Sequence, residues 1–155
     1  MKKTIILILA VAAFASAGVL LKAQDTSYLE VLRSDVRTQR AALISQAMQF
    51  TEAQAKVFWP ICRRYDAELQ VLNDKRIATI LDYGKHVDSL TDAKADELTE
   101  QTFAYYESLI KIQRKYYAEF AKALSPRIAA KFMQVERKIN TYIDVQLQAN
   151  IPLVK

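Results

Sequence analysis

Apolar residues recur along most of this chain at intervals of three and four positions, which is the period of a helix that buries one face. After residue 23 the chain has one glycine, Gly84, and three prolines, so it lacks the turn residues that a β fold needs. The pattern therefore predicts an all-α fold. We expect four helices, over residues 27–49, 51–83, 91–124 and 126–149.

The helix expected over 51–83 has the clearest start. Thr51 and Gln54 have the spacing of a capping box, and Phe50 precedes the cap, where its ring can fold back onto the helix. The apolar stripe of this helix consists of Ala55, Phe58, Cys62, Tyr65, Leu69, Leu72, Ile80 and Tyr83. Pro60 lies inside the stripe and removes one backbone hydrogen bond, so we predict a kink over residues 56–60.

The helix expected over 91–124 follows a loop at residues 84–90 and carries two neighbouring apolar stripes. The first stripe is Ala95, Leu98, Tyr105, Leu109, Ile112 and Tyr116. The second stripe is Phe103, Tyr106, Ile110, Tyr117, Phe120 and Leu124. An apolar face of this width must contact two neighbours, or contact one and stay partly exposed. Either Asp88 or Thr91 can cap this helix.

The two remaining helices are shorter. Leu124, Ser125 and Pro126 mark a junction, with the serine as N-cap of the last helix and the proline in its first helical position. The first helix has the weakest pattern, because polar residues interrupt its stripe at 38–40.

The two central helices are long for a chain of this size. Each would extend about 48 Å, whereas a compact domain of this size has a diameter of about 35–40 Å. We therefore expect an elongated central hairpin with a shorter helix folded onto each end. Because such a hairpin has a thin core, we also expect a homodimer.

The first 23 residues have the layout of a secretory signal peptide. Lys2 and Lys3 precede an apolar run over residues 5–14, and small residues follow at Ala15 and Ala17. Cleavage is expected after Ala17 or Ala23, leaving a single helical domain over 24–155 with no stable membrane insertion. An uncleaved anchor is the alternative, since residues 5–21 are apolar throughout.

Export changes how the charge is interpreted. Loss of the three lysines in the signal peptide lowers the formal net charge from +5 to +2. A nearly balanced exported chain is not expected to bind nucleic acid, although basic and aromatic residues interleave at 111–117.

The sequence does not predict an enzyme, a cofactor or a metal site. The chain has one histidine, His86, and lacks a glycine-rich phosphate loop and a nucleophile–base pair. His86, Asp88 and Asp92 are the weak candidates for a metal ion, with a solvated loop as the favoured interpretation. The single cysteine, Cys62, lies on an apolar stripe, and we interpret it as buried; a disulfide between two chains is the alternative.

Aromatic and basic side chains gather on the helix expected over 91–124, as they do at protein interfaces. The candidates for binding other proteins are Phe103, Tyr106, Arg114, Tyr117 and Phe120. The alternative is that these rings fill the core.

Several short strings resemble the LTxxQ-motif periplasmic proteins, the Spy/CpxP-like family. Residues 50–54, Phe-Thr-Glu-Ala-Gln, resemble one copy of the motif, and residues 124–128, Leu-Ser-Pro-Arg-Ile, resemble a second copy without the glutamine. Residues 58–61, 132–136 and 151–154 resemble a group of small exported proteobacterial proteins at the edge of that family. The resemblance implies a periplasmic, four-helix dimeric cradle that binds unfolded clients without ATP.

Three functional hypotheses follow. The first is a periplasmic, ATP-independent chaperone-like or envelope-stress protein that binds unfolded or envelope proteins. The second is a sensory or regulatory adaptor that binds the outer domain of a membrane sensor, or a metal ion. The third is a purely structural helical dimer.

Overall fold

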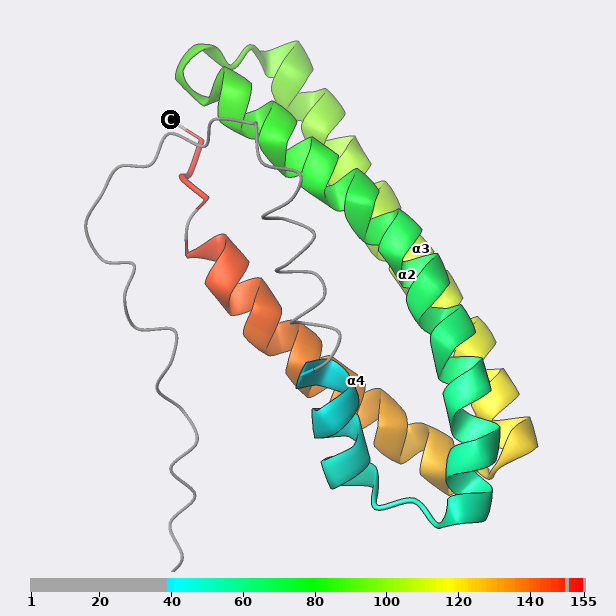
Figure 1. Cartoon of the computed structure of the whole chain (residues 1–155). Helices are drawn as coiled ribbons and strands as arrows, with labels where there is room; N and C mark the ends of the chain where they lie inside the picture. Colours follow the sequence, from blue (N-terminus) through cyan, green and yellow to red (C-terminus); the bar gives the residue numbers. More distant parts are fainter. Residues whose placement is uncertain (1–38, 150, 155) are drawn as a thin grey trace, which may run out of the picture. The chain divides into compact units, whose positions relative to one another are not determined.

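Figure 1 shows the computed structural model of the chain, which describes residues 39–149 and 151–154. The predicted signal peptide, both expected cleavage positions and the helix start expected at Ser27 lie outside these residues. Within the described ranges every regular element is a helix, so the all-α prediction is confirmed.

The described residues form four α-helical segments. Residues 39–48 form the described part of the first helix. Three longer helices follow, α2 (Glu52–His86), α3 (Asp92–Ala123) and α4 (Pro126–Gln148), and the 3-10 turn η1 (Val87–Ser89) joins α2 to α3. α2 and α3, with 35 and 32 residues, are the long central pair, and α4 is shorter with 23. No helix within residues 39–149 combines the length and apolar character needed to cross a membrane.

α2 extends three residues beyond its predicted end at Tyr83, so Gly84 lies inside the helix and the expected loop at 84–90 is shorter. Gly84 does not adopt a positive φ angle. A glycine in a helix costs only about 1 kcal/mol relative to alanine, and helical residues on both sides tolerate that cost. The presence of Gly84 in the sequence therefore led to a predicted end of α2 that is three residues too early.

Local hydrogen bonds define the helix starts. The Thr51 hydroxyl accepts from the backbone N–H of Gln54 at 3.2 Å, and the Gln54 side chain accepts from the backbone N–H of Thr51 at 3.0 Å. The predicted capping box is therefore present. Thr91, and not Asp88, caps α3, and Ser125 caps α4 with Pro126 at its start.

α2 and α3 run antiparallel (Figure 1). Arg64 pairs with Glu119 at one end of the hairpin. Near the other end Thr79 donates to Gln101 at 2.9 Å, and the carboxylate of Asp82 lies 2.7 Å from Lys94. Residue numbers rise along α2 as those of their partners fall along α3, as in an antiparallel pair.

α4 packs beside α3 and runs in the same direction as α2. The Phe58 and Phe132 ring centroids lie 5.0 Å apart, and further along Arg76 binds Asp144 at 2.7 Å. Beyond the end of α4 the hydroxyl of Tyr83 donates to the backbone carbonyl of Pro152 at 2.8 Å.

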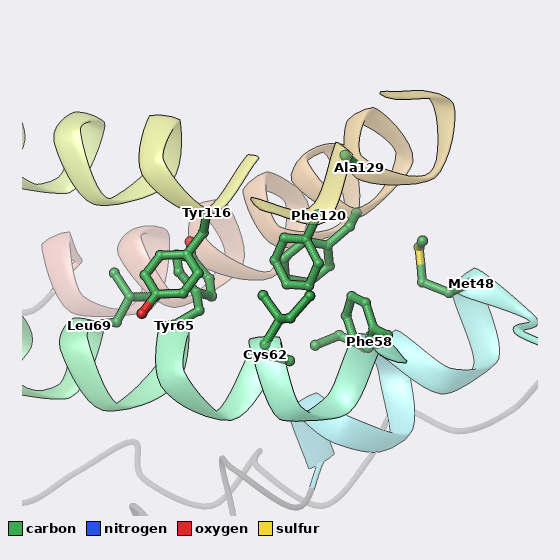
Figure 2. Close-up of a cluster of buried hydrophobic side chains, with 11 residues drawn as sticks. Met48, Phe58, Cys62, Tyr65, Leu69, Tyr116, Phe120 and Ala129 are labelled. Carbon is green, nitrogen blue, oxygen red and sulfur yellow. The ribbon is translucent and has the colours of Figure 1, made fainter. Parts of the chain in front are cut away.

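The main core lies at the end of the hairpin where α2 begins and α3 ends (Figure 2). Its buried residues come from all four helical segments: Ile44, Met48, Phe58, Ile61, Cys62, Tyr65, Leu69, Tyr116, Phe120, Ala129 and Phe132. The helix at 39–48 and the start of α4 thus meet the hairpin at the same end. This follows from the short connections at residues 49–51 and 124–125. They are too short to carry the following helix to the other end of the hairpin before it begins.

Candidate functional site

The outer face of α3 carries a row of large side chains that the described helices leave exposed. Phe103, Tyr106, Ile110 and Tyr117 are 56, 43, 51 and 39 % exposed. Arg114 is also exposed and lies between them. Spacings of three and four residues place all five on one face of the helix. We call Phe103, Tyr106, Ile110, Arg114 and Tyr117 the α3 stripe.

The other apolar face of α3 is packed against α2. Leu98, Tyr105 and Tyr116 are buried, and the rings of Tyr65 and Tyr116 lie 5.2 Å apart. The two stripes read from the sequence therefore have different roles: the first is core and most of the second is surface.

Phe120 is the exception, and its prediction as a binding residue is wrong. It is fully buried, with its ring centroid 5.0 Å from that of Phe58 and 4.8 Å from that of Phe132. At this end of the hairpin α4 joins α2 against α3, so a greater part of the α3 circumference is covered. The number of neighbours at each level of the helix decides which rings stay exposed.

The predicted motif residues are structural. Thr51, Gln54, Ser125 and Pro126 form helix starts, and Phe50 and Leu124 pack against the core. The Phe50 and Phe58 ring centroids are 4.4 Å apart, so Phe50 does fold back onto α2. Pro60 lies within α2, and the kink expected there stays a prediction.

His86 is held within its own helix. Its Nδ1 lies 2.8 Å from the backbone carbonyl of Asp82 and 3.3 Å from the Asp82 carboxylate. Among the residues that the structure describes, no group of three or more histidine, cysteine, aspartate and glutamate side chains is placed to hold a metal ion. His86, Asp88 and Asp92 are therefore not brought together as a metal site.

An apolar groove lies between the second half of α2 and the first half of α3, with residues 151–154 along its side. We call it the α2–α3 groove; its volume is about 290 Å³. Ile80, Leu98 and Tyr105 contribute to its wall, and Tyr106 connects it to the α3 stripe. The guanidinium of Arg76 lies over the Tyr105 ring, 5.1 Å from its centroid. Sequence patterns could not reveal this groove, because three separate segments form it.

A buried ion cluster lies beside the core and was also missed by sequence reasoning. The guanidinium of Arg40 binds Asp66 and Glu136, each at 2.6 Å. Glu136 is only 1 % exposed, and its carboxylate also accepts from the Tyr65 hydroxyl at 3.2 Å and from Asn140 at 3.3 Å. Every buried side-chain nitrogen and oxygen in the described part of the chain has a hydrogen-bond partner. The cluster is thus an ionic connection between the 39–48 helix, α2 and α4.

The pKa values of Arg40, Tyr65 and Cys62 are all raised by their surroundings. Burial alone would lower the pKa of Arg40. The carboxylates of Glu136 and Asp66 raise it by more than burial lowers it, so the net pKa is raised and the guanidinium stays charged. Burial, reinforced by Glu136, raises the pKa of Tyr65 and keeps its hydroxyl a donor. Burial, then the Asp66 charge, raises the pKa of Cys62 to about 12. A buried, protonated Cys62 is neither a nucleophile nor placed for a disulfide between chains.

Two weak signals for the cluster exist in the sequence. The polar interruption at 38–40 contains Arg40, and Glu136 follows Phe132 by four residues, on the apolar face of α4. Neither signal by itself indicates a buried ion pair. Only the fold shows that Arg40 and Glu136, 96 positions apart in the chain, bind each other.

Comparison with known proteins does not assign this chain to a family. No protein-family model, curated protein or solved structure matches this chain.

Proposed function

We propose that this protein is an exported, periplasmic chaperone-like or envelope-stress protein that holds unfolded proteins without ATP. The observation that carries the proposal is the α3 stripe, which keeps three aromatic rings, an isoleucine and an arginine at the surface while the other apolar face of α3 is packed. The resemblance of residues 50–54 to the LTxxQ motif points the same way.

The chemistry of the stripe fits an unfolded partner. Unfolded chains expose apolar side chains, and aromatic rings bury large areas with few rotamers to immobilise. Arg114 adds a cation that can bind the carboxylates and aromatic rings of a client. Such contacts are tolerant of sequence, so a single surface can hold many clients.

The test is light scattering of an aggregating client protein in ATP-free buffer, with and without the chain that begins at residue 24. We expect suppression at near-stoichiometric ratios. The variant Tyr106→Ser/Tyr117→Ser should lose most of this suppression with unchanged helicity, because both rings lie on the surface. Tyr142→Ser is the matched control, since Tyr142 is exposed on α4 outside the stripe.

Failure has a defined meaning. If the unchanged chain does not suppress aggregation, the stripe does not hold unfolded proteins, and the adaptor hypothesis, with one envelope partner, replaces the proposal. If Tyr142→Ser loses as much suppression as the double variant, client holding does not depend on the stripe.

A second candidate, the structural dimer, is favoured by the order of residues along α3. In an antiparallel pair of α3 helices centred on Ile110, Phe103 of one copy faces Tyr117 of the other, and Tyr106 faces Arg114. The same alignment places the acidic first half of each helix beside the basic second half of its partner. A second copy would then cover the stripe that a client would otherwise use.

A further inference from the structure

We infer that the solvent face of α4 is a docking surface for a membrane that contains anionic phospholipids. Side chains at spacings of three and four residues form a row along this face, and all of them are exposed: Arg127, Lys131, Gln134, Lys138, Tyr142 and Val145. We call these six residues the α4 row. The inference goes beyond the proposed function, because it concerns another helix and a partner that is not a protein.

The solvent face of α4 carries charge of one sign. α4 has four basic residues, three of them in the row and the fourth at Arg137, and two acidic residues. Glu136 is buried and binds Arg40. Asp144 binds Arg76. The four basic side chains are exposed and form no ion pair with another described residue. The cations of α4 are therefore available to an anionic partner, whereas its acids are already bound.

The other two long helices are nearly balanced in charge. α2 has six lysine and arginine residues and five acids, and α3 has five lysine and arginine residues and six acids. Opposite charges that alternate in this way cancel over short distances in salt solution. The excess of positive charge on α4 thus gives the molecule one face that an anionic surface attracts.

The length of the row and its apolar end favour a membrane over a soluble anion. The row extends about 27 Å along one side of a helix, so a flat partner can contact all of it. Tyr142 and Val145, at its far end, are 62 and 59 % exposed, and Tyr142 is the most exposed large hydrophobic residue of the described helices. Cations bind lipid phosphates while neighbouring apolar side chains enter the headgroup region, where tyrosine is favoured.

A hollow beside the row has the donors to receive a lipid headgroup. Its volume is about 510 Å³, and its walls include Arg127 and Lys131 from α4 and Gln54 from α2. Lys131 donates to the backbone carbonyl of Met48 at 3.3 Å, which uses one of its three donors. Its other donors and the guanidinium of Arg127 remain for a phosphate.

The experiment is co-sedimentation of the exported chain with lipid vesicles. Vesicles of phosphatidylcholine with phosphatidylglycerol as about one lipid in three are compared with vesicles of phosphatidylcholine alone. We expect binding to the anionic vesicles only, in about 50 mM salt, and loss of this binding in about 500 mM salt.

A charge variant and a matched control locate the contact. Arg127→Gln/Lys138→Gln should weaken binding about 25-fold, since each basic residue near an anionic surface contributes a factor of about five. Lys85→Gln/Lys111→Gln removes the same charge from exposed positions of α2 and α3, and should weaken binding no more than about twofold. Circular dichroism checks that both variants keep their helicity.

The apolar end of the row has its own test. Tyr142→Ser/Val145→Ser should weaken binding to the anionic vesicles several-fold and leave its salt dependence unchanged, because the lost contacts are apolar. No effect of this variant would show that the face does not enter the headgroup region and would overturn the membrane as the partner.

Other outcomes also overturn the inference. These are no binding to anionic vesicles, equal binding to phosphatidylcholine alone, and equal losses for the charge variant and its control. Binding to polyglutamate but not to vesicles would assign the α4 row to an acidic protein. Release from vesicles by inorganic phosphate, at an ionic strength where sodium chloride does not release the protein, would assign the hollow to free phosphate.

Discussion

Arg40 shows how much one side chain contributes at the residue scale. Its guanidinium neutralises Glu136 inside the protein and joins the 39–48 helix to α2 and α4. A buried carboxylate that loses its partner is costly, because neither water nor another cation replaces the interaction. The cluster therefore helps, together with the buried Ile44 and Met48, to hold the first helical segment in place.

We predict that Arg40→Ala lowers the free energy of unfolding by about 3–5 kcal/mol, measured by urea denaturation. Adding Glu136→Gln should recover part of the loss, because the remaining buried group is then neutral. Asp66→Asn is the matched control; Asp66 is 42 % exposed, so this change should cost about 1 kcal/mol or less. Similar losses for Arg40→Ala and Asp66→Asn would contradict the assigned role of Glu136.

Cys62 gives a second prediction at this scale. Because burial and Asp66 raise the pKa of its thiol to about 12, labelling by a thiol reagent at pH 8 should be limited by unfolding, and should become immediate in denaturant. The raised pKa also means that the thiol stabilises the fold below the pKa of the unfolded chain, and that this contribution is lost as the pH rises toward 12. Rapid labelling of the folded protein would show that the thiol is accessible.

At the scale of the elements, short-range hydrogen bonds account for the helix boundaries. Thr51, Thr91 and Ser125 each accept from a backbone N–H three residues later. A boundary of this kind is readable from the sequence because all of its atoms lie within one turn. The helix end predicted at Tyr83 is wrong. A glycine typically ends a helix where its backbone adopts the left-handed conformation that other residues avoid, and Gly84 does not adopt it.

We predict that Gly84→Ala stabilises the protein by about 0.5–1 kcal/mol. The added methyl group would meet open space, with no atom within 4 Å, and alanine has the higher helix propensity. Thermal and urea unfolding measure the effect. A loss of stability would mean that the chain leaves the helix at this residue in solution.

We predict that Thr51→Ala lowers the free energy of unfolding by about 1 kcal/mol, the usual effect of losing an N-cap. The loss would come from the free N–H of Gln54, and Thr51→Ser should retain most of the stability because serine also accepts this bond. Unfolding by urea provides the measurement. A change within error for Thr51→Ala would indicate that water replaces the cap at no cost.

At the scale of the whole molecule, the α3 stripe can be covered either by a second copy of the chain or by a client. Two copies in antiparallel register would pair Phe103 with Tyr117 and bring opposite charges together. A client would use the same rings without a fixed register. The two occupants therefore compete, and oligomeric state and client holding can be measured separately.

For the dimer we predict that Ile110→Asp, at the centre of the antiparallel alignment, weakens self-association by at least about tenfold, measured by sedimentation equilibrium. A twofold axis brings both aspartates together, so the effect is doubled at that point. Tyr142→Ser should leave self-association unchanged. A chain that stays monomeric at every concentration would remove the dimer and leave the stripe to clients.

The sequence by itself determined the helical class, the starts of α2 and α4 and the two apolar stripes of α3, because each depends on residues within a few positions of one another. Tertiary structure alone decided that Tyr105 and Tyr116 are buried while Tyr106 and Tyr117 are exposed, and that Phe120 is part of the core. It also decided that Arg40 meets Glu136 and that residues 151–154 border the α2–α3 groove. These outcomes depend on which helices lie against each level of the hairpin, and interactions between distant segments set that arrangement.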